Sequence, residues 1–125
     1  MLIGDQAIRF REERGADFEY YDLASAWRDL TGLPFVFALW LVRPEVKAAR
    51  ELADALRSQR DLNLKRLDDI AAAQRQVPVA FCQKYFREHL SYLLDVPHKV
   101  ALAEFHRRAV AGGLEVASTI DFRFV

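Results

Sequence analysis

The stretch TGLPFVFALW, residues Thr31–Trp40, decides the fold that the sequence predicts. Gly32 and Pro34 interrupt regular structure at its start, and an apolar run without a polar residue then extends from Phe35 to Val42. A strand with one solvated face alternates polar and apolar residues, whereas a continuous apolar run is typical of a strand covered on both faces. The sequence therefore predicts a buried strand at Phe35–Val42, sandwiched inside a layered sheet.

The rest of the chain alternates short β-prone and longer amphipathic segments. The residues also predict the end of a strand at Leu2–Ile3, before Gly4, and a strand at Phe18–Leu23, and Thr119–Val125 is a candidate for a fourth. This order predicts an α/β fold class, with a small sheet flanked by helices. The predicted helices are a short one through Ala7–Phe10, then Ala24–Leu30, Val46–Leu56, Leu64–Ala71, Val79–Leu90 and His98–Ala111.

Local signals mark several helix ends. Asp22 or Ser25 suits the N-cap of the helix over Ala24–Leu30, and Gly32 suits its C-terminal cap. Two points stay open. The polar break at Ser58–Asp61 divides either two helices or one kinked helix, and Ser91–Leu94 either extends the preceding helix or forms an irregular connection.

Composition narrows the class of protein. The 125 residues carry 18 basic and 18 acidic side chains, so no global field favours nucleic acid or an anionic membrane. The longest apolar run falls far short of the roughly 20 residues that span a bilayer, and the first ten residues do not resemble a secretory signal. Cys82 is the only cysteine, which suggests a reducing compartment. We expect a soluble, cytoplasmic chain.

Residue types that carry chemistry are present, but their spacing forms no catalytic constellation. The histidines do not have the spacing of a zinc pair on a helix, and ordinary helix-surface histidines are favoured. Cys82 is best interpreted as a packed small hydrophobe, Asp68–Asp69 as a solvated face, and Gly112–Gly113 as a helix stop. We therefore predict no metal site, no cofactor and no catalytic residue from spacing. The histidines are His89, His98 and His106.

Two stretches remain of interest for ligand binding. In IGDQAI, Ile3–Ile8, a strand end turns into a helix start, where backbone N–H groups suit an anion. The other stretch is TGLP, Thr31–Pro34, directly before the buried strand. On pattern alone, a plain turn capped by Asp5 and a plain helix stop are favoured over binding sites.

Taken together, the stretches LIGDQAI, YYDLASAWRDLTGLPFVFALW and CQKYFREHLSY, followed by a closing helix, resemble the carboxyl-terminal half of chorismate dehydratases. These enzymes belong to the futalosine route of menaquinone biosynthesis. The central block is the most specific part of the resemblance. Ala24 stands where the family usually has glycine, and SYLLDVP departs from the aspartate-leucine-glycine that usually follows the tyrosine.

The resemblance implies a two-lobed α/β fold like the type 2 periplasmic binding proteins, with the ligand between the lobes. It implies that residues 1–34 are a portion of the second lobe. Residues 35–125 would form the return crossover strand and the C-terminal helices that pack on the first lobe. Family members are about twice as long, so the resemblance also implies that an amino-terminal half is absent.

The implied reaction is the dehydration of chorismate to 3-[(1-carboxyvinyl)oxy]benzoate, a hydro-lyase step without a metal or redox cofactor. The partner would be this small dicarboxylate. The family's carboxylate-binding loop would lie in the absent half, so we expect no activity from the chain alone. The resemblance places cleft or hinge roles on Gly4, Asp5, Thr31, Gly32, Leu33 and Pro34.

Two alternatives stay open. The chain could be a non-catalytic solute-binding-like module, or it could belong to the sister lyase dihydroxynaphthoate synthase, although the TGLPFVFALW block favours chorismate dehydratase. We also expect self-association, or pairing with a missing N-terminal half, because unpaired strands are adhesive.

Overall fold

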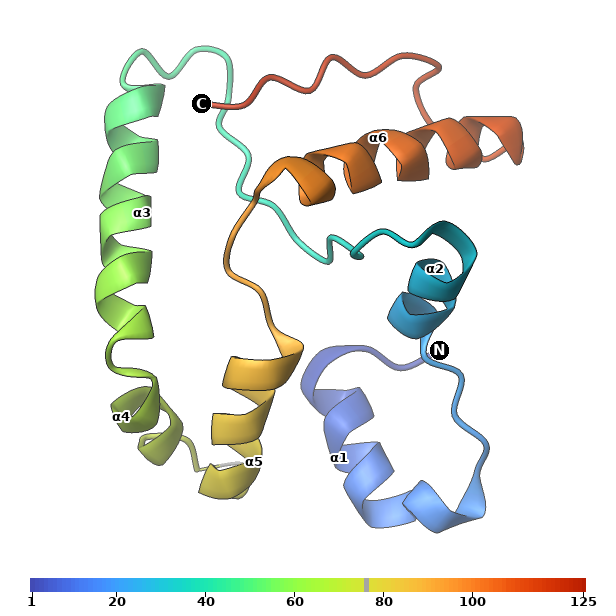
Figure 1. The fold of residues 1–125 in the computed structure, drawn as a ribbon, viewed down its shortest axis with the longest axis vertical. Coiled ribbons are helices and arrows are strands. Elements are labelled where there is room, and N and C mark those ends of the chain that lie inside the picture. Colours follow the sequence, from blue (N-terminus) through green and yellow to red (C-terminus); the bar gives the residue numbers. More distant parts are fainter. Residues whose placement is uncertain (76) are drawn as a thin grey trace.

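The computed structural model describes residues 1–75 and 77–125, except for the side chain of Asp5, and these residues form helices without any strand. The predicted α/β fold class with a small sheet is therefore wrong. Figure 1 shows α3 along one side of the molecule, α6 crossing near α2, and α1 beside α5. The elements are α1 Gly4–Arg14, the 3₁₀ helix η1 Gly15–Asp17, α2 Leu23–Thr31, α3 Ala49–Leu64, α4 Leu67–Ala72, α5 Val79–Lys84, the π-helix η2 Tyr85–His89 and α6 Val96–Ala111.

The segments predicted as strands take other conformations. Gly4 begins α1, Leu23 begins α2, and residues 34–43 and 119–125 have no regular secondary structure. A strand exists only when a neighbouring segment completes its ladder of hydrogen bonds. The backbone of Phe35–Val42 makes no hydrogen bond within the part of the chain that the structure describes. An apolar run predicts an apolar environment, but it does not supply the partner segment.

Helix α2 follows its local sequence signals closely. Asp22 Oδ1 accepts hydrogen bonds from the backbone N–H groups of Ala24 and Ser25, both at 2.9 Å, so it satisfies two donors that have no partner inside the helix. Gly32 closes the other end in the left-handed region, at φ 70°, and its N–H donates to the Arg28 carbonyl at 2.7 Å. The predicted cap at Asp22 and stop at Gly32 are confirmed.

The later helices also match the apolar periodicity, with shifted ends. The polar stretch Ser58–Asp61 lies inside α3, and the break falls instead at Lys65–Arg66. Helix α5 continues into the π-helix and stops at Leu90, so Ser91–Leu94 is an irregular connection. Asp68 joins α4 to this unit: its carboxylate accepts from Arg87 at 2.8 Å and from Gln83 at 3.1 Å.

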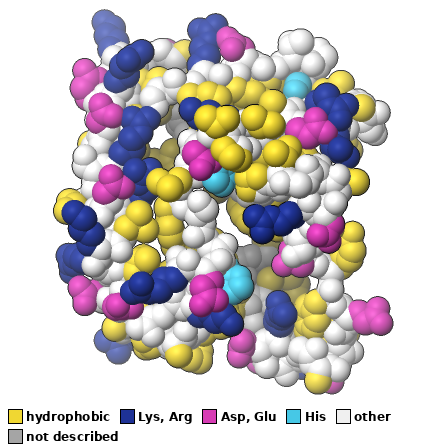
Figure 2. All heavy atoms as spheres, viewed as in Figure 1, with side chains coloured by type: hydrophobic (Ala, Val, Ile, Leu, Met, Phe, Trp, Pro, Cys, Tyr) yellow, Lys and Arg dark blue, Asp and Glu magenta, His cyan; other side chains and the backbone are white. Residues whose placement is uncertain are grey.

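The molecule has a small buried core. A compact monomer of 14.4 kDa exposes about 6,800 Å², whereas this chain exposes 10,544 Å². Hydrophobic side chains accordingly appear over much of the face in Figure 2. The expectation that Phe35–Val42 is covered on both faces is wrong, because Phe37, Trp40 and Leu41 are 71%, 81% and 88% exposed. The buried hydrophobic residues are Trp27, Ala71, Cys82, Ala101 and Ala109.

Candidate functional site

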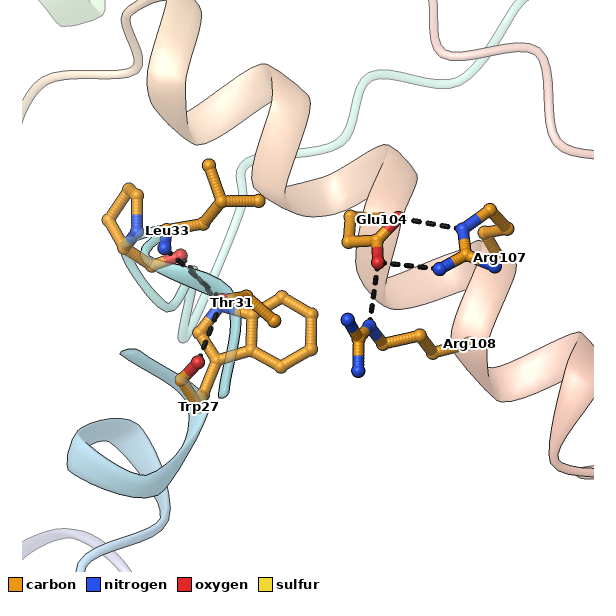
Figure 3. A network of polar contacts seen from close by, with 7 residues as sticks. Trp27, Thr31, Leu33, Glu104, Arg107 and Arg108 are labelled. Atoms are coloured by element: carbon orange, nitrogen blue, oxygen red, sulfur yellow. Dashed lines mark hydrogen bonds and ion pairs between the residues drawn. The ribbon is translucent and has the colours of Figure 1, made fainter. Parts of the chain in front are cut away.

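The turn at Thr31–Pro34 is an ordered structure at the C-terminal end of α2. The hydroxyl of Thr31 donates to the Trp27 carbonyl at 2.7 Å and accepts the N–H of Leu33 at 3.1 Å. Figure 3 shows these two bonds holding the turn over the last turn of the helix. The left-handed Gly32 lies between them and reverses the chain direction. Four predicted site residues therefore form one local unit.

Trp27 connects this turn to α6. Its indole Nε1 donates to the Pro34 carbonyl at 3.1 Å, and its ring packs edge-to-face on Phe35 and Phe105, with centroids 6.2 and 5.6 Å away. Phe35 and Phe105 are themselves edge-to-face at 5.7 Å. Such aromatic pairs contribute beyond their buried area. The three rings surround an apolar cavity of about 40 Å³, which is lined by Trp27, Pro34, Phe35, Val36, Ala101, Leu102 and Phe105.

A charged cluster on α6 lies beside the aromatic group. Glu104 accepts two hydrogen bonds from Arg107, both at 2.7 Å, and one from Arg108 at 2.6 Å. These bonds to Arg107, and then those to Arg108, lower the pKa of Glu104 to about 2, so the carboxylate stays ionised near neutral pH. The guanidinium carbon of Arg108 is also 5.9 Å from the Trp27 ring centroid. Figure 3 shows the cluster facing Trp27.

A second cavity, of about 140 Å³, lies between α1 and the α5–η2 unit. Arg9 is the one charged residue among its lining residues, and Gln74 and Tyr85 supply other polar groups. Cys82 lines it and is 3% exposed, in agreement with the interpretation as a packed small side chain. The lining residues are Ile8, Arg9, Gln74, Val77, Cys82, Tyr85 and Phe86.

Two of the histidines lie on α6 and make polar contacts outside the helix. The Nδ1 of His98 contacts the Asp95 carboxylate, and the Nε2 of His106 donates to the Ala117 carbonyl at 2.6 Å. Across the described ranges, no group of three or more His, Cys, Asp or Glu side chains has the arrangement to hold a metal ion.

The structure does not join the two predicted groups of site residues. Gly4 is the first residue of α1, at φ +59° and in open space, and among the described residues no hydrogen bond links it to the turn. The side chain of Asp5 lies outside the described part of the structure, so the predicted capping and binding roles of Asp5 are not addressed. Thr31–Pro34 is thus the candidate site, bordered by the Trp27 ring.

Sequence reasoning missed the contribution of α6 to this site. The helix over His98–Ala111 was predicted, but Glu104 and Arg108 were not singled out. Their spacing of four residues is the usual spacing of a helical ion pair, and this signal could have found them. The contact of Phe105 with Trp27 joins residues 78 positions apart, and no local pattern predicts it.

The left-handed conformation of Gly32 leads to a stability prediction. Replacing Gly32 with Ala adds a Cβ that meets no atom within 4 Å, so any cost comes from the backbone at φ +70°. We expect Gly32→Ala to lower the free energy of unfolding by about 1 kcal/mol. The measurement is urea unfolding followed by far-UV circular dichroism.

Gly15 provides the matched control. It also has open space around it, but its φ is −57°, which any residue adopts. Gly15→Ala should be neutral or stabilising by up to about 1 kcal/mol. Equal effects of the two substitutions would contradict the assigned role of Gly32.

Comparison with known proteins places the chain in a class. The model of the family described as menaquinone biosynthesis matches residues 1–111, and the chain belongs to this family. It is 31% identical to the chorismate dehydratase of Thermus thermophilus, over 84% of this chain and 45% of that protein. The chain therefore spans less than half the length of this relative. No solved structure matches it significantly. Within residues 1–75 and 77–125, no helix combines the length and apolar character that crossing a membrane requires.

Proposed function

We propose that the chain carries part of a chorismate dehydratase and acts in the dehydration of chorismate to 3-[(1-carboxyvinyl)oxy]benzoate. The observation that carries the proposal is its 31% identity to the Thermus thermophilus enzyme, together with the family match over residues 1–111. The reaction makes the protein a lyase. The lone, unpaired Cys82 fits a reducing compartment such as the cytoplasm.

We further propose that the chain is inactive without additional polypeptide. Pockets for molecules of this size usually enclose about 300–1,000 Å³, and the two described cavities enclose about 40 and 140 Å³. The smaller one is lined by apolar side chains and by Trp27, whose indole N–H is already bonded to the Pro34 carbonyl. Chorismate carries two carboxylates, and positioning it requires several fixed donors. The missing walls and donors would come from a pairing polypeptide or from a second copy.

In this proposal, Thr31–Pro34 borders the substrate cleft, together with Gly4 and Asp5. The boundary between two lobes would follow Pro34, with residues 1–34 in one lobe and 35–125 in the other. The turn is suited to a border because three hydrogen bonds, at Thr31, Gly32 and Leu33, fix its shape before any ligand arrives. A wall that is already ordered loses little conformational entropy when the ligand binds.

The first test measures turnover by the purified chain. We expect no conversion of chorismate above the uncatalysed rate, as followed by chromatography of the benzoate product. The Thermus thermophilus enzyme under the same conditions is the positive control. Enzymatic turnover by this chain alone would show that the cleft does not need further polypeptide.

A chimera tests the reaction itself. The matched region of the Thermus thermophilus enzyme is replaced by this chain, and the product is measured as before. We expect detectable turnover from the folded chimera, and at least tenfold less when it carries Trp27→Ala, because that substitution removes the support of the Thr31–Pro34 turn. A folded chimera without turnover would contradict the proposed function.

A further inference from the structure

The cavity between α1 and the α5–η2 unit has the size of a site for a single aromatic ring. Its volume is about 140 Å³, close to that of an engineered apolar cavity of about 150 Å³ that binds benzene. The cavity beside Trp27 encloses about 40 Å³, which is too small for a ring. The described linings of the two cavities have no residue in common, so a ligand in the larger one lies apart from the Thr31–Pro34 turn.

The inner part of the larger cavity is apolar and aromatic. Cys82 is 3% exposed, and the other apolar and aromatic lining residues are half-buried. Tyr85 supplies a ring that stacks on Phe81, with centroids 5.8 Å apart, and that lies 6.2 Å from the centroid of Phe86. Aromatic rings pack favourably on further rings in offset or edge-to-face arrangements. An aromatic ligand therefore finds both sufficient volume and suitable neighbours here.

The polar side chains of the cavity lie at its exposed rim. Arg9 and Gln74 are exposed, in contrast to the inner residues, and among the described residues of the lining Arg9 alone is charged. A guanidinium pairs with a carboxylate through two parallel N–H groups. Arg9 has another interaction within the chain, and its five N–H donors are enough to hold a carboxylate as well. The charge of the rim therefore favours an anionic ligand over a cationic one.

An apolar inner part and a basic rim suit a molecule with an aromatic ring at one end and a carboxylate at the other. We propose that this cavity binds a single-ring aromatic carboxylate of the benzoate class, with its ring beside Tyr85 and Phe86 and its carboxylate at Arg9. The site is separate from the proposed cleft at Thr31–Pro34, so benzoate binding and chorismate turnover succeed or fail independently. The competing occupant is a side chain of the additional polypeptide.

Methyl NMR detects a bound ring at the cavity itself. Benzoate, which is ionised at pH 7, is titrated into the whole chain while the methyl groups of Ile8, Val77 and Ile120 are observed. Ile8 and Val77 line the cavity, whereas Ile120 lies in the segment after α6. We expect saturable ring-current shifts at Ile8 and Val77 and a constant Ile120 signal. The dissociation constant should be on the order of 1 mM, because one buried ring and one charged pair give weak affinity.

The decisive variant is Arg9→Met, which removes the charge and keeps a long side chain. It should raise the dissociation constant for benzoate at least about tenfold. Arg11→Met is the matched control, since Arg11 is exposed on the same helix but does not line the cavity. The control should change the dissociation constant by less than about twofold. Benzylamine carries the same ring with a positive charge, and it should bind the unchanged chain at least about tenfold more weakly than benzoate.

The chimera with the Thermus thermophilus enzyme distinguishes the two occupants. If the cavity is a ligand site, the folded chimera should show the same benzoate-induced shifts at Ile8 and Val77 as the chain alone. Loss of these shifts in the chimera would overturn the proposal, because a side chain of the additional polypeptide would then fill the cavity.

Three results with the chain alone would also overturn it. The first is that the shifts at Ile8 and Val77 are absent, or do not saturate and occur equally at Ile120. The second is that benzylamine binds as tightly as benzoate. The third is that Arg9→Met binds benzoate as tightly as the unchanged chain does.

Discussion

Replacing Trp27 with Ala should lower the free energy of unfolding by about 3 kcal/mol, the range usual for truncating a buried large aromatic residue. Trp27 is 9% exposed, and its ring is the shared neighbour of Phe35 and Phe105. The substitution also leaves the Pro34 carbonyl without its indole donor. Among the described residues, Trp27 is the one large side chain that is buried, so no other can compensate for its loss. Urea unfolding followed by far-UV circular dichroism measures the loss without relying on tryptophan emission.

Two further variants separate the contribution of the indole N–H from that of the buried ring. Trp27→Phe keeps an aromatic ring but removes the N–H donor, so it should cost about 1–2 kcal/mol. Tyr21→Ala removes an aromatic side chain that is 79% exposed, and it should change the free energy of unfolding by less than about 0.5 kcal/mol. If Trp27→Ala were no more destabilising than Tyr21→Ala, the aromatic cluster would not be a core.

Placing a charge at Ala101 should destabilise the chain by about 3 kcal/mol or more, because the carboxylate of Ala101→Asp would lose its water beside the Trp27 cavity. Ala101 is 2% exposed and lines that apolar cavity of about 40 Å³. Ala103 lies on the exposed side of the same helix. Ala103→Asp carries the same loss of helix propensity, which is about 0.7 kcal/mol. The difference between the two variants therefore isolates the burial of the charge.

The pH dependence gives an independent check. Burial would raise the pKa of the new carboxyl in the folded state above its unfolded value. The cost is then complete above the folded pKa, and it decreases as the pH falls toward the unfolded value, about 4 for aspartate. The difference in the free energy of unfolding between Ala101→Asp and Ala103→Asp should therefore become smaller as the pH falls between these two pKa values. If this difference did not change with pH, the carboxylate introduced by Ala101→Asp would be exposed to solvent.

Structural features that depend only on residues close together in the sequence could be predicted. The cap at Asp22, the stop at Gly32 and the final helix α6 depend on contacts between neighbours along the chain, and all are present. The packed Cys82 follows from its place on an amphipathic helix. The turn Thr31–Pro34 was singled out for the same reason, because Gly and Pro specify local geometry.

Features that depend on distant partners could not be predicted in this way. The apolar run from Phe35 to Val42 indicated an apolar environment, but a sheet also requires hydrogen-bonding neighbours, and the described chain supplies none. Similarly, the Trp27–Phe105 contact joins α2 to α6, and neither helix encodes the identity of its neighbour. The prediction of a sheet was wrong, and the role of α6 was missed, because both depend on partners that are distant in the sequence.

The bond from Trp27 to Pro34 has a mechanical consequence. The indole N–H bonds to Pro34 at the proposed lobe boundary. The same ring packs on Phe35 and Phe105, which lie in the part formed by residues 35–125. Rotation at Thr31–Pro34 would have to break these contacts, so this turn is expected to be rigid and not to act as a hinge. Any opening and closing motion would pivot further along the chain, beyond Phe37, where the backbone has no such attachment.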